Sequence, residues 1–290
     1  MNPRTITLVI ILLVAVGGTA LLAVNQRPSS SEIQNIKVAV TINPYAEFVK
    51  KVGGDRVNVL VLVPPNANPH TFDLSPSTIK AVSEAKIYFK VGGGLEFEVN
   101  WLNKLAELNP NMLIVDTSKG IELIGSREHT DPHIWLSPKN AILIVDSIYK
   151  GLVQIDPDGA KIYKENRDAY INELETLDTE VKETLSDLRT RVFIVYHPAW
   201  TYFARDYNLK QIALEEEGKE PTVEEMVKIV ESARAEGVKS VFAEPQFDPR
   251  ELEVITKELG LSVISVDTHS FTDYVTHIKG FALSLKEALS

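Results

Sequence analysis

Four short segments of the sequence carry side chains that bind metal ions, and they define the chemistry to be explained. Three neutral imidazoles and one carboxylate that meet at one point form a closed four-coordinate site, which zinc accepts well. The segments lie about sixty to seventy residues apart, so only folding can bring them together. They are Asn68-Pro-His70-Thr, Asp131-Pro-His133-Ile, Tyr196-His197-Pro and Val266-Asp267-Thr. The candidate ligands are therefore His70, His133, His197 and Asp267.

Length and composition limit the classes of protein that could carry such a site. A chain of 290 residues with 44% hydrophobic and 24% charged residues is typical of a soluble globular protein of one or two domains. The formal net charge of −10 argues against nucleic acid as a partner, because nucleic acid favours a basic surface. The chain has no cysteine, which excludes disulfides, thiolate ligands, a cysteine nucleophile and lipid attachment through an N-terminal cysteine.

Residues 1–31 differ from the rest of the chain. An uncharged, mostly apolar stretch from Thr5 to Gln26 follows Arg4, which is typical of a secretory signal peptide. The stretch also approaches the roughly 20 residues that a spanning helix needs, so it could instead stay as a membrane anchor, with residues 28–31 as a linker. Both interpretations take the body out of the cytoplasm, to the periplasm or to the outer face of the cell membrane.

From residue 32 onward, apolar runs alternate with amphipathic stretches, a pattern typical of a parallel α/β fold. The expected strands are 37–42, 57–63, 87–91, 112–115, 192–196, 211–214, 238–243 and 261–266. The expected helices are 44–52, 75–84, 96–108, 138–154, 160–188, 199–207, 222–236, 249–259 and 273–289. The pattern predicts an N-terminal lobe over 32–158 and a C-terminal lobe over 190–290, each with a mainly parallel sheet flanked by helices.

One long helix, within residues 159–189, is expected to bridge the two lobes. Residues 160–188 contain no proline or glycine, and their apolar residues recur at helical spacing on one face. A coiled-coil dimer is the competing interpretation. Because there is a single stripe without further heptads, we expect the helix to pack against the body of its own chain and the protein to be a monomer. The stripe consists of Tyr163, Tyr170, Leu174, Leu177, Val181, Leu185 and Leu188.

Three of the four candidate ligands come after expected strands. His197 and Asp267 follow strands directly, and His70 follows a strand and the proline-bounded loop 64–69. Ligands of open α/β sheets collect at the carboxyl ends of the strands. His133 comes instead from a long loop before a helix. Since each half supplies two ligands, the metal is expected in the cleft between the lobes.

Carboxylates near the ligands could orient the imidazoles by accepting a hydrogen bond from the second ring nitrogen. Asp73, Asp131 and Glu244 are candidates for this role, although each could equally be a solvated or capping residue. His269 lies two residues beyond Asp267 and is another candidate for a supporting position.

Six stretches of the body occur in one order and together resemble the metal-binding solute receptors of ABC-type zinc and manganese importers. The resemblance extends from about Ile36 to the C-terminus. The stretches are Asn68-Pro-His70-Thr-Phe-Asp-Leu-Ser-Pro-Ser, Gly92-Gly-Gly-Leu-Glu96, Asp131-Pro-His133-Ile-Trp135-Leu-Ser-Pro138, Tyr196-His197-Pro-Ala-Trp-Thr-Tyr-Phe203, Glu215-Glu-Glu-Gly218-Lys-Glu-Pro221-Thr and Phe242-Ala-Glu-Pro-Gln246.

The resemblance implies a site and a role. It assigns the ligands to His70, His133, His197 and Asp267, and a histidine at the third position is typical of zinc-type members, where manganese-type members commonly have glutamate. Ligand chemistry also favours zinc, since manganese prefers more oxygen ligands. The family further implies two α/β lobes bridged by a long helix, and delivery of the ion to a membrane permease driven by a cytoplasmic ATPase.

The chain departs from the family pattern in two ways, and three alternative functions are compatible with the sequence. Many zinc receptors carry a long loop rich in histidine before the second ligand, whereas this chain has a short loop with one spare histidine, His129. The cysteine that anchors many relatives is absent. The alternatives are a manganese receptor, a zinc hydrolase and a surface adhesin or scaffold. A hydrolase needs an open metal position for water, which Asp267 would close. The acidic run Glu215–Glu217 could serve a loop or a docking surface.

Overall fold

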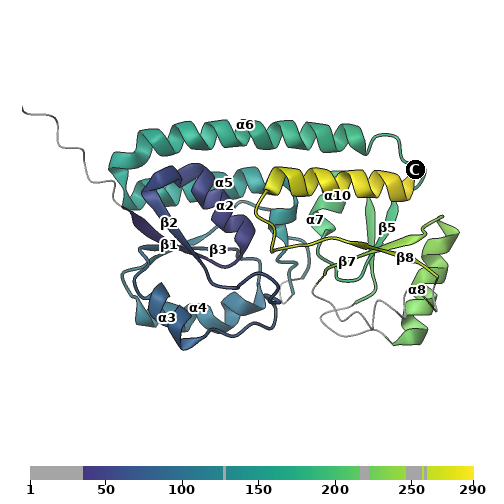
Figure 1. Ribbon diagram of the computed structural model, residues 1–290, viewed down its shortest axis with the longest axis horizontal. Helices are drawn as coiled ribbons and strands as arrows, with labels where there is room; N and C mark the ends of the chain where they lie inside the picture. Colours follow the sequence, from purple (N-terminus) through teal and green to yellow (C-terminus); the bar gives the residue numbers. More distant parts are fainter. Residues whose placement is uncertain (1–34, 127–128, 216–221, 246–256, 258–259) are drawn as a thin grey trace, which may run out of the picture. The chain divides into compact units, whose positions relative to one another are not determined.

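Two four-stranded sheets, one in each lobe, form the framework of the body (Figure 1). The computed structural model describes residues 35–126, 129–215, 222–245, 257 and 260–290. The first sheet has the order β2-β1-β3-β4, with β1 (Ile36–Val40), β2 (Val57–Val61), β3 (Ile87–Lys90) and β4 (Leu113–Asp116). The second has the order β6-β5-β7-β8, with β5 (Val192–Val195), β6 (Lys210–Ala213), β7 (Ser240–Ala243) and β8 (Ser262–Ser265). All these pairings are parallel, which confirms the predicted fold class.

Helices cover the sheets. Figure 1 shows α2 and α5 on one side of the first sheet and α3 and α4 on the other. The α-helices are α2 (Asn43–Gly53), α3 (Pro76–Val82), α4 (Glu96–Leu108), α5 (Pro138–Ile155), α6 (Ala160–Thr184), α7 (Thr201–Asp206), α8 (Val223–Ala235) and α10 (Tyr274–Leu289). Short 3₁₀ turns are η1 (Gly54–Arg56), η2 (Ile134–Leu136) and η3 (Pro157–Gly159). In the described part of the chain, no helix has both the length and the apolar character to span a bilayer. The expected helix 249–259 and segment 1–31 lie outside the described residues.

Side-chain caps mark the starts of several described helices, and three of these caps follow loops that carry candidate ligands. Ser75 and Ser137 each accept a backbone hydrogen bond through the side-chain oxygen, at 3.2 and 3.1 Å, and a proline follows each of them in the first turn. Asp273 caps α10 in the same way, at 2.9 Å. The caps fix where α3, α5 and α10 begin, and so limit the freedom of the preceding loops.

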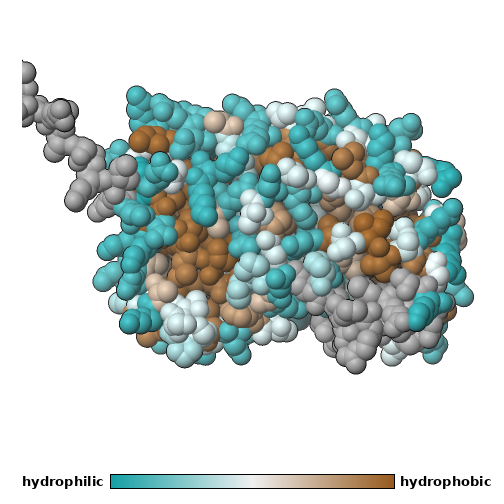
Figure 2. Space-filling model, in the orientation of Figure 1, coloured by the Kyte–Doolittle hydropathy of each residue, from teal (hydrophilic) through white to brown (hydrophobic). Residues whose placement is uncertain are grey.

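The long helix α6 lies against the rest of the body. Its 25 residues correspond to about 37 Å. The predicted apolar stripe is buried up to Leu185, Leu188 is partly buried, and α6 packs on α2, α5 and α10. The helix ends at Thr184 rather than at residue 188, because the Arg191 guanidinium binds the carbonyl oxygens of Leu185 and Ser186 and takes them out of the helical pattern. The outer face of α6 is mostly hydrophilic (Figure 2).

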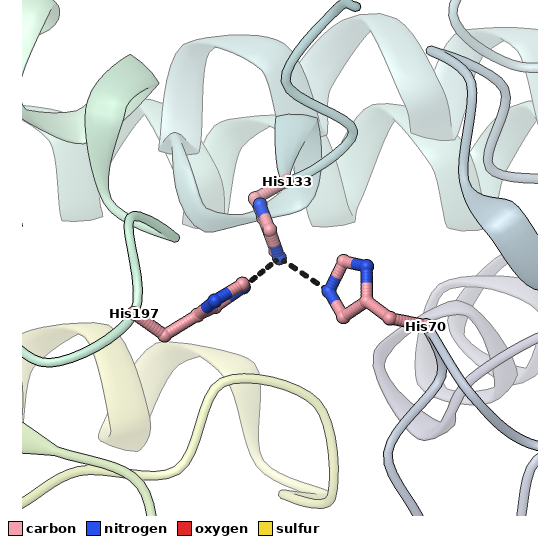
Figure 3. A group of neighbouring side chains, drawn as sticks. All are labelled: His70, His133 and His197. Atoms are coloured by element: carbon pink, nitrogen blue, oxygen red, sulfur yellow. Dashed lines mark hydrogen bonds between the residues drawn. The ribbon is translucent and has the colours of Figure 1, made fainter. Parts of the chain in front are cut away.

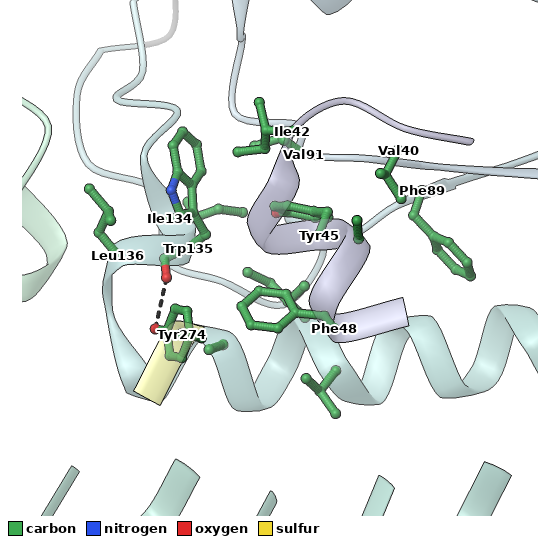
Figure 4. Packing of buried hydrophobic residues seen from close by; sticks show 14 of the residues in the cluster. Val40, Ile42, Tyr45, Phe48, Phe89, Val91, Ile134, Trp135, Leu136 and Tyr274 are labelled. Atoms are coloured by element: carbon green, nitrogen blue, oxygen red, sulfur yellow. Dashed lines mark hydrogen bonds between the residues drawn. The ribbon is translucent and has the colours of Figure 1, made fainter. Parts of the chain in front are cut away.

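A single hydrophobic core connects the first sheet, the bridging helices and one face of the second sheet. Trp135 lies at its centre, fully buried, and its carbonyl oxygen accepts a 2.8 Å hydrogen bond from the Tyr274 hydroxyl (Figure 4). The opposite face of the second sheet has a smaller core of its own, which includes Ile194 and Val241. Residues 35–290 form one compact unit, so the predicted lobe boundaries at 158 and 190 stay a prediction.

Candidate metal centre

Three histidine side chains from distant parts of the chain meet tip to tip (Figure 3). The Nε2 atom of His133 lies 3.2 Å from Nε2 of His70 and 3.1 Å from Nε2 of His197. One ring nitrogen from each histidine belongs to a group whose atoms all lie within 4.8 Å of one another. The centre therefore joins a loop after β2, the turn before α5 and the loop after β5.

His70 is held by the loop that follows β2. The backbone N–H of His70 donates a 2.8 Å hydrogen bond to the side-chain oxygen of Asn68. In the same loop, Asn66 has a positive φ of 68°, a conformation that asparagine tolerates better than most residues. The His70 ring then lies beside Glu96, with 2.7 Å between Nδ1 and Oε2.

A turn of three glycines brings Glu96 to that position. Gly92 has a φ of 80°, and a Cβ atom there would lie 2.4 Å from an oxygen of Asp116, so any other residue would be strained and crowded. Buried Glu98 closes the turn, because its carboxylate accepts hydrogen bonds from the amides of Val91 and Gly92 at 2.7 and 2.8 Å. Helix α4 consequently begins with Glu96 facing His70.

His133 is the most buried of the three histidines, with 4% of its surface exposed. The Asp131 carboxylate accepts hydrogen bonds from the backbone N–H and from Nδ1 of His133, at 2.9 and 2.8 Å. The next three residues form η2 and are fully buried in the core, which fixes the backbone next to His133. Burial lowers the pKa of His133 to about 4, against the opposing effect of the Asp131 carboxylate. The imidazole is therefore neutral near pH 7, the form that binds metal.

His197 follows β5 and Tyr196, and its partner comes from the neighbouring strand. Its Nδ1 lies 3.0 Å from Oε2 of Glu215, which follows β6. Because β5 and β6 are adjacent and parallel, the residues after them meet at the same edge of the sheet. Both side chains are largely buried, with 15% and 11% exposed.

Each of the three imidazoles thus has a carboxylate at Nδ1. An ionised carboxylate only accepts hydrogen bonds, so Nδ1 carries the proton and Nε2 is left with a lone pair. Three lone pairs that face one point repel one another unless a cation lies between them. Zinc–nitrogen bonds of about 2.0–2.1 Å in a tetrahedron place two nitrogens about 3.3 Å apart. The observed separations of 3.2 and 3.1 Å are close to that value.

The centre opens into a small cavity of about 110 Å³. Besides the three histidines, the described residues that line it include Trp135, Glu244 and His269. The ring of His269 points its Nε2 at the carbonyl oxygen of Ala67, 2.9 Å away, and so connects the C-terminal lobe to the loop of His70. The Trp135 indole N–H donates a 2.7 Å hydrogen bond to the carbonyl of Thr268. The two lobes therefore meet around this cavity.

Asp267 is held by hydrogen bonds within its own loop. Among the described residues, the metal-competent group contains His70, His133 and His197 without Asp267. Oδ1 of Asp267 accepts hydrogen bonds from the amides of His269 and Ser270, at 3.0 and 2.9 Å. Asp267 nevertheless lies near the centre, because its charge acts on the buried residues Glu244 and His269.

The supporting residues were predicted only in part. Asp131 orients a ligand candidate, whereas Asp73 accepts a 3.2 Å hydrogen bond from the indole of Trp101. Glu96 and Glu215 were not predicted as partners of the histidines. The one available signal was position, since Glu215 comes directly after an expected strand. His129 is exposed and lies outside the group. Glu216 and Glu217, the rest of the acidic run, lie outside the described residues.

Comparison with known proteins relates this geometry to a family. The family model described as "Zinc-uptake complex component A periplasmic" matches residues 38–288. The chain is 30% identical over 267 residues to the metal ABC transporter substrate-binding lipoprotein SsaB of Streptococcus sanguinis, covering 87% of this chain and 84% of that protein. It is 29% identical over 282 residues to the manganese ABC transporter substrate-binding lipoprotein scaA of Streptococcus gordonii, covering 92% and 89%.

A solved structure shows the same fold. The crystal structure of ZnuA is similar with a TM-score of 0.84 and 40% sequence identity, over 88% of this chain and all of that one. The family match covers most of the chain, and the converging histidines are the kind of site that a metal receptor needs. The chain belongs to the family of metal-binding solute receptors of ABC importers, and it is therefore a binding protein rather than an enzyme.

Proposed function

We propose that this receptor captures a zinc ion outside the cytoplasm and delivers it to the permease of an ABC importer. His70, His133 and His197 are the proposed nitrogen ligands. The observation that carries the proposal is the convergence of their three Nε2 atoms, each with its Nδ1 beside a carboxylate. Three imidazoles favour zinc over manganese, which prefers oxygen ligands. A ZnuA deletion mutant that is 40% identical to this chain was solved with zinc bound, which supports the same choice.

Asp267 is the proposed fourth ligand. Its Oδ1 accepts two amide hydrogen bonds in the loop after β8, and a carboxylate oxygen would bind the ion. A carboxylate adds the negative charge that partly offsets a divalent cation among neutral imidazoles. Small movements of the loop would bring this oxygen to the ion, since His197 and Asp267 follow parallel strands of the same sheet.

The proposal is tested by removing one ligand and one matched histidine that lies elsewhere. We expect His197→Ala to weaken zinc binding at least tenfold, measured by competition with a chromophoric chelator. His129→Ala is the control, because His129 is exposed and lies outside the metal-competent group of the described residues. Equal affinities of the two variants would refute the assignment of His197.

Manganese is the second candidate cargo, favoured by one observation. The relative from Streptococcus gordonii is named as a manganese transporter component, and this cavity has a carboxylate in its wall. Elemental analysis of the protein purified without added metal, followed by competition between zinc and manganese, distinguishes the two ions. We expect zinc to displace manganese.

The route out of the cytoplasm is assigned to residues 1–31, either as a cleaved signal peptide or as an uncleaved anchor. The chain has no cysteine to accept a lipid, although several relatives are named lipoproteins. Mass spectrometry of the mature N-terminus, together with fractionation of cells, tests this assignment. A full-length chain found in the cytoplasm would contradict it.

A further inference from the structure

Glu244 lies between two strands whose following residues belong to the proposed site. It comes directly after β7, which pairs with β5 on one side and β8 on the other. His197 follows β5 and Asp267 follows β8. Since the three strands are parallel, the residues after them share one edge of the sheet, and Glu244 occupies the central position.

The carboxyl group of Glu244 is buried in the cavity wall, where its own backbone N–H is a hydrogen-bond partner. The residue is 5% exposed and lines the cavity together with the three histidines. Its Oε2 atom is buried and has no hydrogen-bond partner among the described residues. A buried polar atom of this kind costs free energy and calls for an explanation.

The charges around Glu244 increase that cost. Burial raises the pKa of Glu244 well above its usual value, and the nearby carboxylates of Glu215 and Asp267 raise it further. Both of these neighbouring charges are negative. A divalent cation beside the three imidazoles would supply the positive charge that this wall of the cavity lacks.

We propose that Glu244 is a further oxygen ligand of the bound cation, so that its unpartnered Oε2 completes a site of three imidazoles and two carboxylates. This inference rests on the proposed function of the same site. Zinc accepts a fifth ligand, and an additional oxygen makes the site more favourable for manganese than three imidazoles and one carboxylate would be. Glu244 would therefore help to determine which ion the receptor holds.

The test is Glu244→Gln, which keeps the shape of the side chain and removes its charge. We expect zinc affinity to fall at least tenfold and manganese affinity to fall by a larger factor. We also expect the visible absorption of the cobalt(II)-loaded variant to intensify, because absorption increases when five-coordinate cobalt becomes four-coordinate. Glu236→Gln is the matched control, since it removes the same charge from an exposed position in the same lobe.

The thermal midpoint of each apoprotein separates a role in binding from a role in folding. We expect the apo midpoint of Glu244→Gln to equal or exceed that of the unmodified protein, because the variant removes a buried acid. Should Glu244→Gln fold poorly, Glu244→Asp keeps the charge but shortens its reach. The Asp variant should then show the intensified cobalt absorption.

Two results would overturn the inference. One is a Glu244→Gln variant that binds both ions as Glu236→Gln does. The other is a lowered apo midpoint with an unchanged cobalt spectrum, which would mean a structural role. In both cases a loss of binding in His197→Ala would leave the proposed function intact, whereas retained binding in His197→Ala would remove the function as well.

Discussion

The three carboxylates beside the histidines make a quantitative prediction possible, because two of them allow the same substitution in different surroundings. Glu96 pairs with His70 and Glu215 pairs with His197, at similar distances of 2.7 and 3.0 Å. The side chain of Glu96 is 56% exposed, whereas that of Glu215 is 11% exposed. Glu96→Gln and Glu215→Gln therefore compare one hydrogen bond in water with one largely shielded from it.

The difference in exposure sets the expected magnitudes. A carboxylate that orients a ligand histidine typically contributes about 10- to 100-fold to metal affinity. We expect Glu215→Gln to weaken zinc binding by about tenfold or more. Exposed ion pairs contribute only about 0–1 kcal/mol, so Glu96→Gln should weaken binding by about fivefold at most.

The assay is competition with a chromophoric chelator at pH 7 and fixed ionic strength, with the thermal midpoint of each apoprotein as a check on folding. Raising the salt concentration should weaken the effect of Glu96→Gln, since solvent screens that pair. If Glu96→Gln weakened binding as much as Glu215→Gln, the argument from exposure would be wrong. If neither variant changed affinity, the carboxylates would not orient the ligands.

Three further predictions concern pH and stability. Zinc affinity should fall as the pH drops below about 6, because protons compete with metal for the imidazoles, and a flat titration between pH 7 and 5 would count against three histidine ligands. Burial raises the pKa of Glu98 to about 7, so its protonated form stabilises the fold at low pH and about 3 kcal/mol is lost as the pH rises from 4.5 through 7. Denaturant titrations should show this fall in the apoprotein and not in Glu98→Gln. Asp156 binds the Arg56 guanidinium and the Tyr163 hydroxyl, and Asp156→Asn should lower the free energy of unfolding by about 3 kcal/mol while zinc affinity of the folded protein stays the same.

The fold could be predicted from the sequence because the signals for its helices and strands are local. Proline and serine at the starts of α3 and α5, and alternating apolar runs such as β2, are read within a few residues. The residue at which α6 ends could not be predicted in this way. It depends on Arg191, a residue after the helix whose guanidinium reaches back to carbonyls at the helix end.

The metal centre could be predicted from the sequence only where a motif marked its residues. His70, His133 and His197 each stand in a distinctive segment, and the structure brings them together. Glu215 belongs to an acidic run that reads equally well as a surface, and its contact with His197 depends on the adjacency of β5 and β6. The amides of His269 and Ser270 bind the Asp267 carboxylate, a contact set by the conformation of the loop after β8. Sequence patterns do not encode such loop conformations.

The shared interior of residues 35–290 has a consequence for unloading. A receptor whose lobes rotate about a hinge can release its ligand by opening. In this protein, such a rotation would separate side chains that pack in one hydrophobic core. We therefore expect release of the ion to depend on movement of the loops that carry the imidazoles. The permease, with the ATPase behind it, would have to supply the work of extraction from outside.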